Sequence, residues 1–181
     1  MKDKTIIVTS SATGIGQAFS IAVSSYGTKI VVADMNPGDK TVQLIKSAGG
    51  EAIYTKVDVR DEESKKSMAK AAIDWTERID GLINNADYFR EVWLTPFEEI
   101  KMETWDRIFD VNVKGIWQCC KSVMPSMRET GGGSIINISS VLAVAGQPGY
   151  LHYVASKGAV LAMTKGIAKE CVVDNVRTIF S

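Results

Sequence analysis

The sequence predicts an α/β fold with a doubly wound parallel sheet. Short runs rich in isoleucine and valine alternate with longer segments of helical periodicity along all 181 residues. Continuous apolar runs of this length are typical of strands that are buried on both faces. Strand–helix alternation gives right-handed crossovers between parallel strands. Because no repeat, low-complexity tract or linker interrupts the pattern, we expect one domain over residues 1–181.

The apolar runs define the predicted strands, and the periodic segments between them define the helices. We predict strands at 4–9, 29–34, 51–59, 81–86, 133–139 and 175–180. We predict helices at 15–26, 37–48, 61–75, 100–127 with a possible break, and 151–171. The segment 61–75 shows the amphipathic pattern well, since small and apolar residues recur on one side and charges on the other. The last strand has no further strand beside it, so it should leave an exposed edge.

Charge and hydropathy exclude two classes of partner. Lysine plus arginine equals aspartate plus glutamate at 21 each, and the sequence pI is about 6.6. This balance removes the electrostatic argument for a nucleic acid or an anionic membrane surface. No apolar stretch reaches the length of a membrane span, and no signal-peptide core follows the N-terminus. We therefore expect neither a nucleic-acid nor a membrane partner.

The metal and redox chemistry predicted from cysteine and histidine is minimal. Cys119 and Cys120 are adjacent and Cys171 is the third cysteine, so the chain has no disulfide framework, and a reducing cytoplasm fits best. His152 is the single histidine, and there is no Cys-x-x-Cys motif, so we predict no metal site.

The stretch "TSSATGIGQA", residues 9–18, follows the first predicted strand and has the composition of a phosphate-binding loop. Gly14 and Gly16 flank Ile15 where the first helix begins. The free backbone N–H groups and the dipole of such a helix end bind a pyrophosphate. Taken alone, a glycine pair is explained equally well by a tight turn without a ligand.

An acidic residue at the end of the second strand favours the phosphate interpretation. Asp34 lies about 20 residues after the glycines, where its carboxylate would accept hydrogen bonds from an adenine ribose. The same carboxylate would repel a ribose phosphate, and no arginine follows it, since Met35 and Asn36 come next. We therefore favour NAD over NADP, with an NADP-dependent reductase and a solvated turn at Asp34 as the alternatives.

The late motif "YVASK" places a tyrosine and a lysine one helical turn apart. Tyr153 and Lys157 share a helix face, and the lysine ammonium is expected to lower the tyrosine pKa toward the working pH of an acid–base catalyst. Ser140 ends the fifth predicted strand, at the edge that faces the ligand crevice of a parallel sheet. We expect Ser140 to hydrogen-bond the substrate oxygen, and Ser139 to satisfy backbone groups instead.

These motifs together resemble the short-chain dehydrogenase/reductase family of the classical type. The resemblance rests on the spacing Thr9-Ser10-x-x-x-Gly14-x-Gly16, on "DV" at 58–59, on "NNA" at 84–86 and on "SS…YVASK". These stretches follow one another in order through nearly the whole chain. The resemblance implies a Rossmann-like fold and an NAD(P)-dependent enzyme that transfers a hydride between a cofactor, here NAD, and a small-molecule secondary alcohol or ketone.

The resemblance also implies roles for individual residues. Asp58 and Val59 would border the adenine, Asn85 and Ala86 would line the cofactor groove, and Lys157 would hold the nicotinamide ribose. The complete set of predicted cofactor-binding residues is Ser10, Thr13, Gly14, Ile15, Gly16, Asp34, Asp58, Val59, Asn85, Ala86, Tyr153 and Lys157. The predicted catalytic residues are Asn112, Ser140, Tyr153 and Lys157, with Asn112 supporting a proton relay through water and the lysine.

The last helix carries two further features with open interpretations. His152 would point about 100° away from Tyr153 around the helix, so we expect a substrate-side or surface residue. A row of small residues would let another helix approach closely: Ala155, Gly158, Ala159, Ala162 and Gly166. The resemblance implies packing against a partner subunit, and hence a homodimer or homotetramer, although internal packing would explain the same row.

The sequence departs from the family pattern at three places. Ser10 and Asp87 stand where the family usually has glycine, and the chain ends near the sixth strand, so that the C-terminal part of the usual fold is absent. These departures leave an alternative function: a non-catalytic dinucleotide-binding or scaffold protein, or an inactive truncated form of such an enzyme. Nothing in the sequence selects a substrate.

Overall fold

The computed structural model describes residues 1–89 and 92–181, and its strands form one parallel six-stranded sheet. Along the sheet the order is β3-β2-β1-β4-β5-β6, and every neighbouring pair is parallel. This arrangement confirms the doubly wound α/β fold. The strands are β1 (Thr5–Thr9), β2 (Lys29–Asp34), β3 (Glu51–Lys56), β4 (Gly81–Asn84), β5 (Gly133–Asn137) and β6 (Val176–Phe180).

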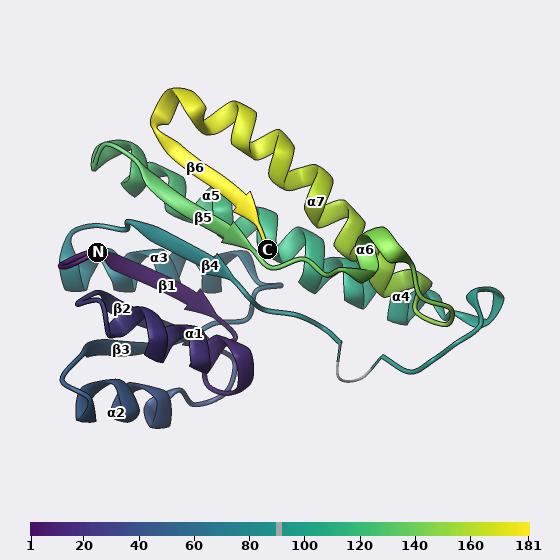
Figure 1. Ribbon diagram of the computed structural model, residues 1–181, viewed down its shortest axis with the longest axis horizontal. Coiled ribbons are helices and arrows are strands. Elements are labelled where there is room, and N and C mark those ends of the chain that lie inside the picture. Colours follow the sequence, from purple (N-terminus) through teal and green to yellow (C-terminus); the bar gives the residue numbers. More distant parts are fainter. Residues whose placement is uncertain (90–91) are drawn as a thin grey trace.

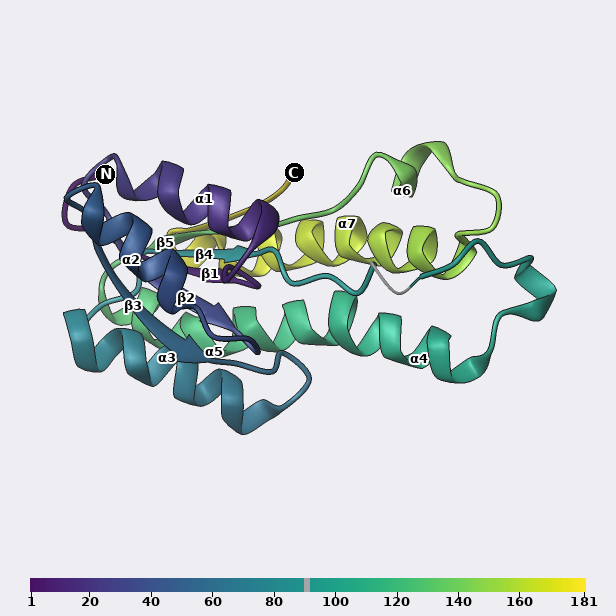
Figure 2. The same ribbon diagram turned by 90° about the horizontal axis from the view of Figure 1, so that it is seen from below.

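Helices cover both faces of the sheet, as Figure 2 shows from below. The helices α1 (Gly14–Ser24) and α2 (Asp39–Ser47) lie on one face, and α3 (Glu62–Thr76) and α5 (Ile116–Glu129) lie on the other. The remaining helical segments are α4 (Met102–Phe109), α6 (Leu142–Ala145), α7 (Leu151–Cys171), and the short turns η1 (Phe97–Glu99), η2 (Asp110–Gly115) and η3 (Val172–Asp174). No helix among the described residues is long and apolar enough to cross a membrane.

Two hydrophobic cores lie on opposite faces of the sheet. Ile7 and Val31 belong to the core that packs against α3, α5 and α7, whereas Ile6 and Ile30 belong to the core beneath α1 and α2. Successive side chains of a strand point to opposite faces. Each continuous Ile/Val run therefore forms a strand whose successive side chains enter the two cores alternately, so that both faces of the strand are apolar.

Three predicted strands extend two or three residues past the carboxyl ends of the observed strands. The predicted strands 51–59, 81–86 and 133–139 stop at Lys56, Asn84 and Asn137 in the structure. The residues beyond these ends leave the sheet and turn into the loops at its carboxyl edge. They include the segments that the sequence assigns to cofactor and substrate, so the strand ends deliver these segments to one edge.

The long predicted helix 100–127 is broken, as the sequence suggested. Helix α4 gives way to the π-helical turn η2, after which α5 continues. Single π-helical turns inside longer helices are often found at functional sites. The short helix α6 was not predicted, because four residues carry too little periodicity to detect.

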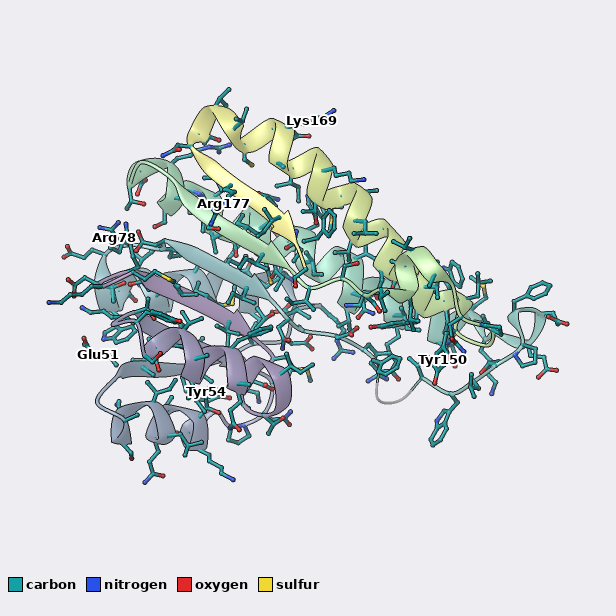
Figure 3. All side chains as sticks on the ribbon, in the orientation of Figure 1. Glu51, Tyr54, Arg78, Tyr150, Lys169 and Arg177 are labelled. Atoms are coloured by element: carbon teal, nitrogen blue, oxygen red, sulfur yellow. The ribbon has the colours of Figure 1, made fainter. Side chains whose placement is uncertain are left out.

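The elements at the carboxyl edge extend well beyond the sheet. In Figure 1 the segment that joins β4 to α4 (called here the arm after β4), helix α6 and the start of α7 lie beyond the arrowheads of the strands. Figure 3 shows Tyr150, which precedes α7, on this side, and Arg78, which precedes β4, at the opposite end of the sheet. The strand order reverses between β1 and β4, the place where open α/β sheets bind ligands.

Candidate active site

The turn between β1 and α1 presents the unpaired N-terminus of a helix. Thr13 is the N-cap residue, no side chain caps the helix, and no acidic residue lies in its first turn. The first N–H groups of α1 are therefore not claimed by capping side chains, and the positive end of the helix dipole faces the loop. Gly14, Ile15 and Gly16 lie at this end, and the arrangement fits the pyrophosphate of a dinucleotide.

Close packing against the backbone explains why residue 16 of this loop is glycine, whereas Ser10 has a backbone conformation that favours glycine. A Cβ on Gly16 would overlap the carbonyl oxygen of Ser10 and would lie 2.6 Å from Asn85 Nδ2. Ser10 itself has a φ of +52°, in the left-handed region that favours glycine. The departure at Ser10 therefore falls on a position whose backbone conformation suits the family's usual residue.

The Asp34 carboxylate, at the end of β2, hydrogen-bonds the backbone of the loop between β1 and α1. Its Oδ2 accepts a hydrogen bond from the backbone N–H of Ala12 at 2.9 Å, and its Oδ1 accepts one from the N–H of Asn36 at 2.9 Å. The residue is only 7% exposed. Asp34 thus lies beside the loop as predicted, and it has a structural contact there that the sequence did not reveal.

The "DV" segment leaves β3 through a well-anchored turn. Asp58 forms a salt bridge with Arg60 at 2.7 Å, and the hydrogen bond from Arg60 holds the pKa of the Asp58 carboxyl below its usual value. Val59 is buried, and its carbonyl oxygen accepts a hydrogen bond from Lys65 Nζ at 2.7 Å. Gly115 of η2 packs against Val59, which joins this turn to the π-helical segment.

The "NNA" segment is tied directly to the phosphate loop. The backbone N–H groups of Asn85 and Ala86 both donate to Thr9 Oγ1 at 3.0 Å. Asn85 Nδ2 also donates to the carbonyl oxygens of Thr9 and Ser10, both at 3.1 Å. Two of the predicted cofactor segments thus form one hydrogen-bonded unit at the ends of β1 and β4.

Asn112 lies in the π-helical turn and joins three parts of the site. Its Oδ1 accepts a hydrogen bond from the N–H of Tyr88 at 2.8 Å, and its Nδ2 donates to Ser156 Oγ at 3.2 Å. The side chain is fully buried. Asn112 therefore connects the arm after β4 with α7, close to the helix face that carries Tyr153 and Lys157.

The predicted catalytic pair meets a carboxylate. Tyr153 Oη donates a hydrogen bond to Asp87 Oδ2 at 3.1 Å, and Lys157 Nζ lies 3.3 Å from the same oxygen. Lys157 Nζ also donates to the carbonyl oxygen of Ile138 at 3.0 Å. The Ser140 side chain lies near enough to lower the pKa of Tyr153 in part. Ser140, Tyr153 and Lys157 are thus together, with Asp87 among them.

The expected effect of Lys157 on Tyr153 was wrong for this arrangement. Burial, followed by the Asp87 carboxylate, raises the pKa of Tyr153 above its usual value, while the hydrogen bond with Ser140 lowers it only in part. Burial lowers the pKa of Lys157, and Asp87 opposes that shift. The physical reason is that burial disfavours the charged phenolate, and the Asp87 carboxylate, which pairs with the lysine ammonium, disfavours it further.

The structure corrects the expected positions of His152 and Ser140, and it confirms that Ser139 bonds a backbone group. His152 is 1% exposed, so it is not a surface residue, and burial lowers its pKa. Ser140 lies beyond the end of β5, where its Oγ accepts a hydrogen bond from the N–H of Leu142 at 3.2 Å. Ser139 Oγ does satisfy a backbone group, the carbonyl oxygen of Lys157, at 3.0 Å.

The sequence reasoning missed the position of Asp87 within this cluster. In the sequence, Asp87 is identified only as a residue that stands where the family usually has glycine. The available signal was its place directly after "NNA", because the residue that follows a strand at the carboxyl edge projects toward the same crevice as Ser140. The hydroxyl of Thr9, which accepts from two N–H groups, had no comparable signal.

Comparisons with known proteins agree with the fold and motifs. The sequence model described as short chain dehydrogenase matches residues 4–180. The chain is 33% identical over 179 residues to a cyclopentanol dehydrogenase of Comamonas testosteroni, covering 98% of the chain and 70% of the relative. It is 34% identical over 182 residues to a 3-oxoacyl-(acyl-carrier-protein) reductase of Thermotoga maritima, covering 98% of the chain and 72% of that relative.

A solved structure gives the same result at the level of the backbone. An NAD⁺-bound xylitol dehydrogenase superposes with a TM-score of 0.94 at 29% identity, covering 99% of the chain and 69% of that structure. The chain therefore spans about 70% of the length of these proteins.

Proposed function

Because the chain belongs to the short-chain dehydrogenase family, we propose that it is an oxidoreductase that transfers a hydride between NAD(H) and a small secondary alcohol or its ketone. The observation that carries this proposal is the gathering of Ser140, Tyr153 and Lys157 at the carboxyl edge of the sheet, where α1 offers its N-terminus. Named relatives act on a cyclic alcohol or an oxoacyl group, and a structural neighbour is named for a polyol. These three classes are the first to screen.

The proposed chemistry divides between the cofactor and this chain. A bound nicotinamide supplies or accepts the hydride. Tyr153 gives a proton to the substrate oxygen in reduction and takes one from it in oxidation, while the Ser140 hydroxyl steadies the charge that develops on that oxygen. Lys157 binds the nicotinamide ribose, and Asn112 supports the return of protons through water and Lys157.

Replacement of Tyr153 by phenylalanine tests the catalytic assignment. Tyr153→Phe should reduce turnover at least about 10²- to 10⁴-fold, the usual contribution of general acid–base catalysis, while the Kd for NADH stays nearly unchanged. Tyr150→Phe is the matched control, because Tyr150 precedes α7 and its ring contacts Phe89, and the change removes a hydroxyl from another tyrosine of the same region. Equal loss of turnover and of NADH binding in Tyr153→Phe would mean that the tyrosine is structural.

The preference for NAD rests on Asp34 and is tested separately. Titration of the Asp34→Ser variant should show that the Kd ratio of NADPH to NADH falls about fivefold or more, since a close charge–charge repulsion exceeds ~1 kcal/mol. Asp39→Ser removes an exposed carboxylate in the first turn of α2 and should leave the ratio unchanged. An unchanged ratio in Asp34→Ser would refute the assignment and reopen NADP.

The alternative function is a dinucleotide-binding protein without turnover. Two observations favour it: the left-handed Ser10 in the phosphate loop, and the Asp87 carboxylate between Tyr153 and Lys157. Selective NADH binding with no turnover across the three substrate classes would support this alternative.

The family resemblance further suggests a homo-oligomer, and the three cysteines, all free and buried, suit a reducing cytoplasm.

A further inference from the structure

Asp87 has direct contacts with both groups that the proposed reaction needs. Its Oδ2 is 3.1 Å from Tyr153 Oη and 3.3 Å from Lys157 Nζ, and its side chain is 27% exposed. Lys157 is 1% exposed, so Asp87 provides the counter-charge of a buried ammonium. The carboxylate reaches this position from the loop after β4, whereas the other two residues lie on α7.

The surroundings of Tyr153 leave few other charges to consider. Within the described residues, Lys157 Nζ lies 5.6 Å from the Tyr153 ring centroid, and Ser140, in the turn after β5, is an uncharged neighbour that lowers the pKa of Tyr153 in part. The Phe89 ring packs on Tyr153 with centroids 4.6 Å apart. Asp87 is therefore the negative charge that bears most directly on the hydroxyl, and it also engages the positive one.

A carboxylate in this position acts on the tyrosine in two ways. A carboxylate can only accept a hydrogen bond, so it keeps the proton on Tyr153 Oη. Its charge also repels a phenolate and compensates the ammonium that would otherwise stabilise one. Both effects favour the protonated tyrosine, which is the form that gives a proton to a carbonyl oxygen.

We propose that Asp87 is a positioning residue that holds the Tyr153 hydroxyl as a proton donor and engages the Lys157 ammonium, so that the site is set for reduction of a ketone. The proposal rests on the proposed function. In the reduction, a bound NADH would supply the hydride to the carbonyl carbon and would become NAD⁺, while the π electrons of the carbonyl move to its oxygen. That oxygen takes the Tyr153 proton, which leaves a phenolate that regains a proton from solvent.

A titration that needs no turnover tests the proposal. The chain has five tyrosines, so the ultraviolet absorbance of tyrosinate is recorded with and without the Tyr153→Phe change, and the difference reports Tyr153 alone. In the Asp87→Asn variant, the ionisation of Tyr153 should move to lower pH by about one to three units, the usual effect of one adjacent charge. Asp87→Glu keeps the charge and should retain part of the upward displacement.

A matched control separates local from general electrostatics. Asp110 is exposed and pairs with Lys114 at 3.6 Å, so Asp110→Asn removes one negative charge from the chain without touching Tyr153. An Asp87→Asn titration that coincides with wild type or with Asp110→Asn would overturn the proposal. Thermal unfolding of each variant verifies that the fold is intact, and Asp87→Ser provides a second neutral variant should Asp87→Asn not fold.

Turnover then distinguishes this proposal from the proposed function. In Asp87→Asn, the rise of kcat/KM for alcohol oxidation with pH should shift to lower pH. If the tyrosinate shift occurs but no variant turns over any substrate, the positioning role holds and the proposed oxidoreductase function fails. If turnover occurs but neither the tyrosinate titration nor the pH profile of oxidation shifts in Asp87→Asn, the oxidoreductase function holds and the positioning role of Asp87 fails.

Discussion

At the scale of single residues, Ser10 shows how one side chain affects a whole loop. Its backbone is left-handed at the turn from β1 to α1, and its carbonyl oxygen accepts a hydrogen bond from Asn85 Nδ2 while it faces Gly16. A left-handed conformation costs an ordinary residue about 1–2 kcal/mol. Ser10 cannot relax without disturbing these contacts, so the strain is held by the surrounding loop.

We expect Ser10→Gly to stabilise the chain. Removing the strain should gain about 1–2 kcal/mol, and the larger backbone entropy of glycine in the unfolded chain takes back about 0.5–1 kcal/mol. Urea unfolding should therefore show a net gain of up to about 1.5 kcal/mol. Ser10→Ala keeps a Cβ and should change stability little; a glycine variant no more stable than the alanine variant would contradict the strain.

At the scale of elements, helix α3 carries a buried lysine that the amphipathic pattern did not identify. Lys65 is 1% exposed, and its ammonium donates to the carbonyl oxygen of Val59 at 2.7 Å. The bond fixes the turn that leads from β3 to α3, where the adenine is expected to bind. Burial lowers the pKa of Lys65 below its usual value.

The lowered pKa of Lys65 predicts a pH dependence of stability with a definite sign. The unfolded chain keeps the Lys65 proton up to pH about 10.4, whereas the folded chain releases it earlier. Between the lowered pKa of Lys65 in the folded chain and its ordinary pKa in the unfolded chain, the unfolded state binds more protons. The free energy of unfolding therefore rises with pH in this window. Compared with Lys65→Met, the wild type should therefore gain stability as the pH approaches 10.4 from below.

The neighbouring Lys66 supplies the control for that experiment. Lys66 is exposed, and its hydrogen bonds with Glu63 and Glu62 raise its pKa. The folded chain therefore holds this proton longer, and its contribution to stability is lost as the pH rises through the raised pKa. Urea unfolding over an alkaline pH series should give opposite slopes for Lys65→Met and Lys66→Met, each relative to wild type. Slopes of the same sign would contradict the buried ammonium.

At the scale of the whole molecule, β6 is one of the two outer strands of the sheet, and it exposes an apolar side chain. The alternation along β6 leaves Ile179 41% exposed, whereas Thr178 is 6% exposed. Ile179 lies in register with Ile136 on β5. An outer strand with exposed apolar side chains is a template for pairing with another chain.

We expect Ile179→Lys to reduce concentration-dependent self-association through β6, because a charged side chain on an outer strand opposes edge-to-edge pairing. Light scattering over a concentration series measures this, and the unfolding free energy should change by no more than about 0.5 kcal/mol. Thr178→Lys is the contrasting variant, since burial of an ammonium there should destabilise the fold. Identical association of wild type and Ile179→Lys would show that β6 does not mediate it.

The local pattern of the chain was sufficient for the elements and most of the site. Apolar runs identified the six strands, helix α7 has the predicted bounds 151–171, and the break before α5 was foreseen. The carboxyl edge does gather Ser140, Tyr153 and Lys157. These features depend on side-chain periodicity and on the rule that parallel strands end at one edge, both of which can be read along the chain.

The tertiary structure alone decided the electrostatics of that site. Asp87 and Tyr153 are 66 residues apart in sequence, and their hydrogen bond forms only because the loop after β4 crosses the face of α7. The direction of the Tyr153 pKa and the burial of His152 and Lys65 follow from which groups share a volume with little water. Periodicity specifies the face of an element on which a residue lies, whereas a pKa depends on the charges and solvent that the assembled fold places around it.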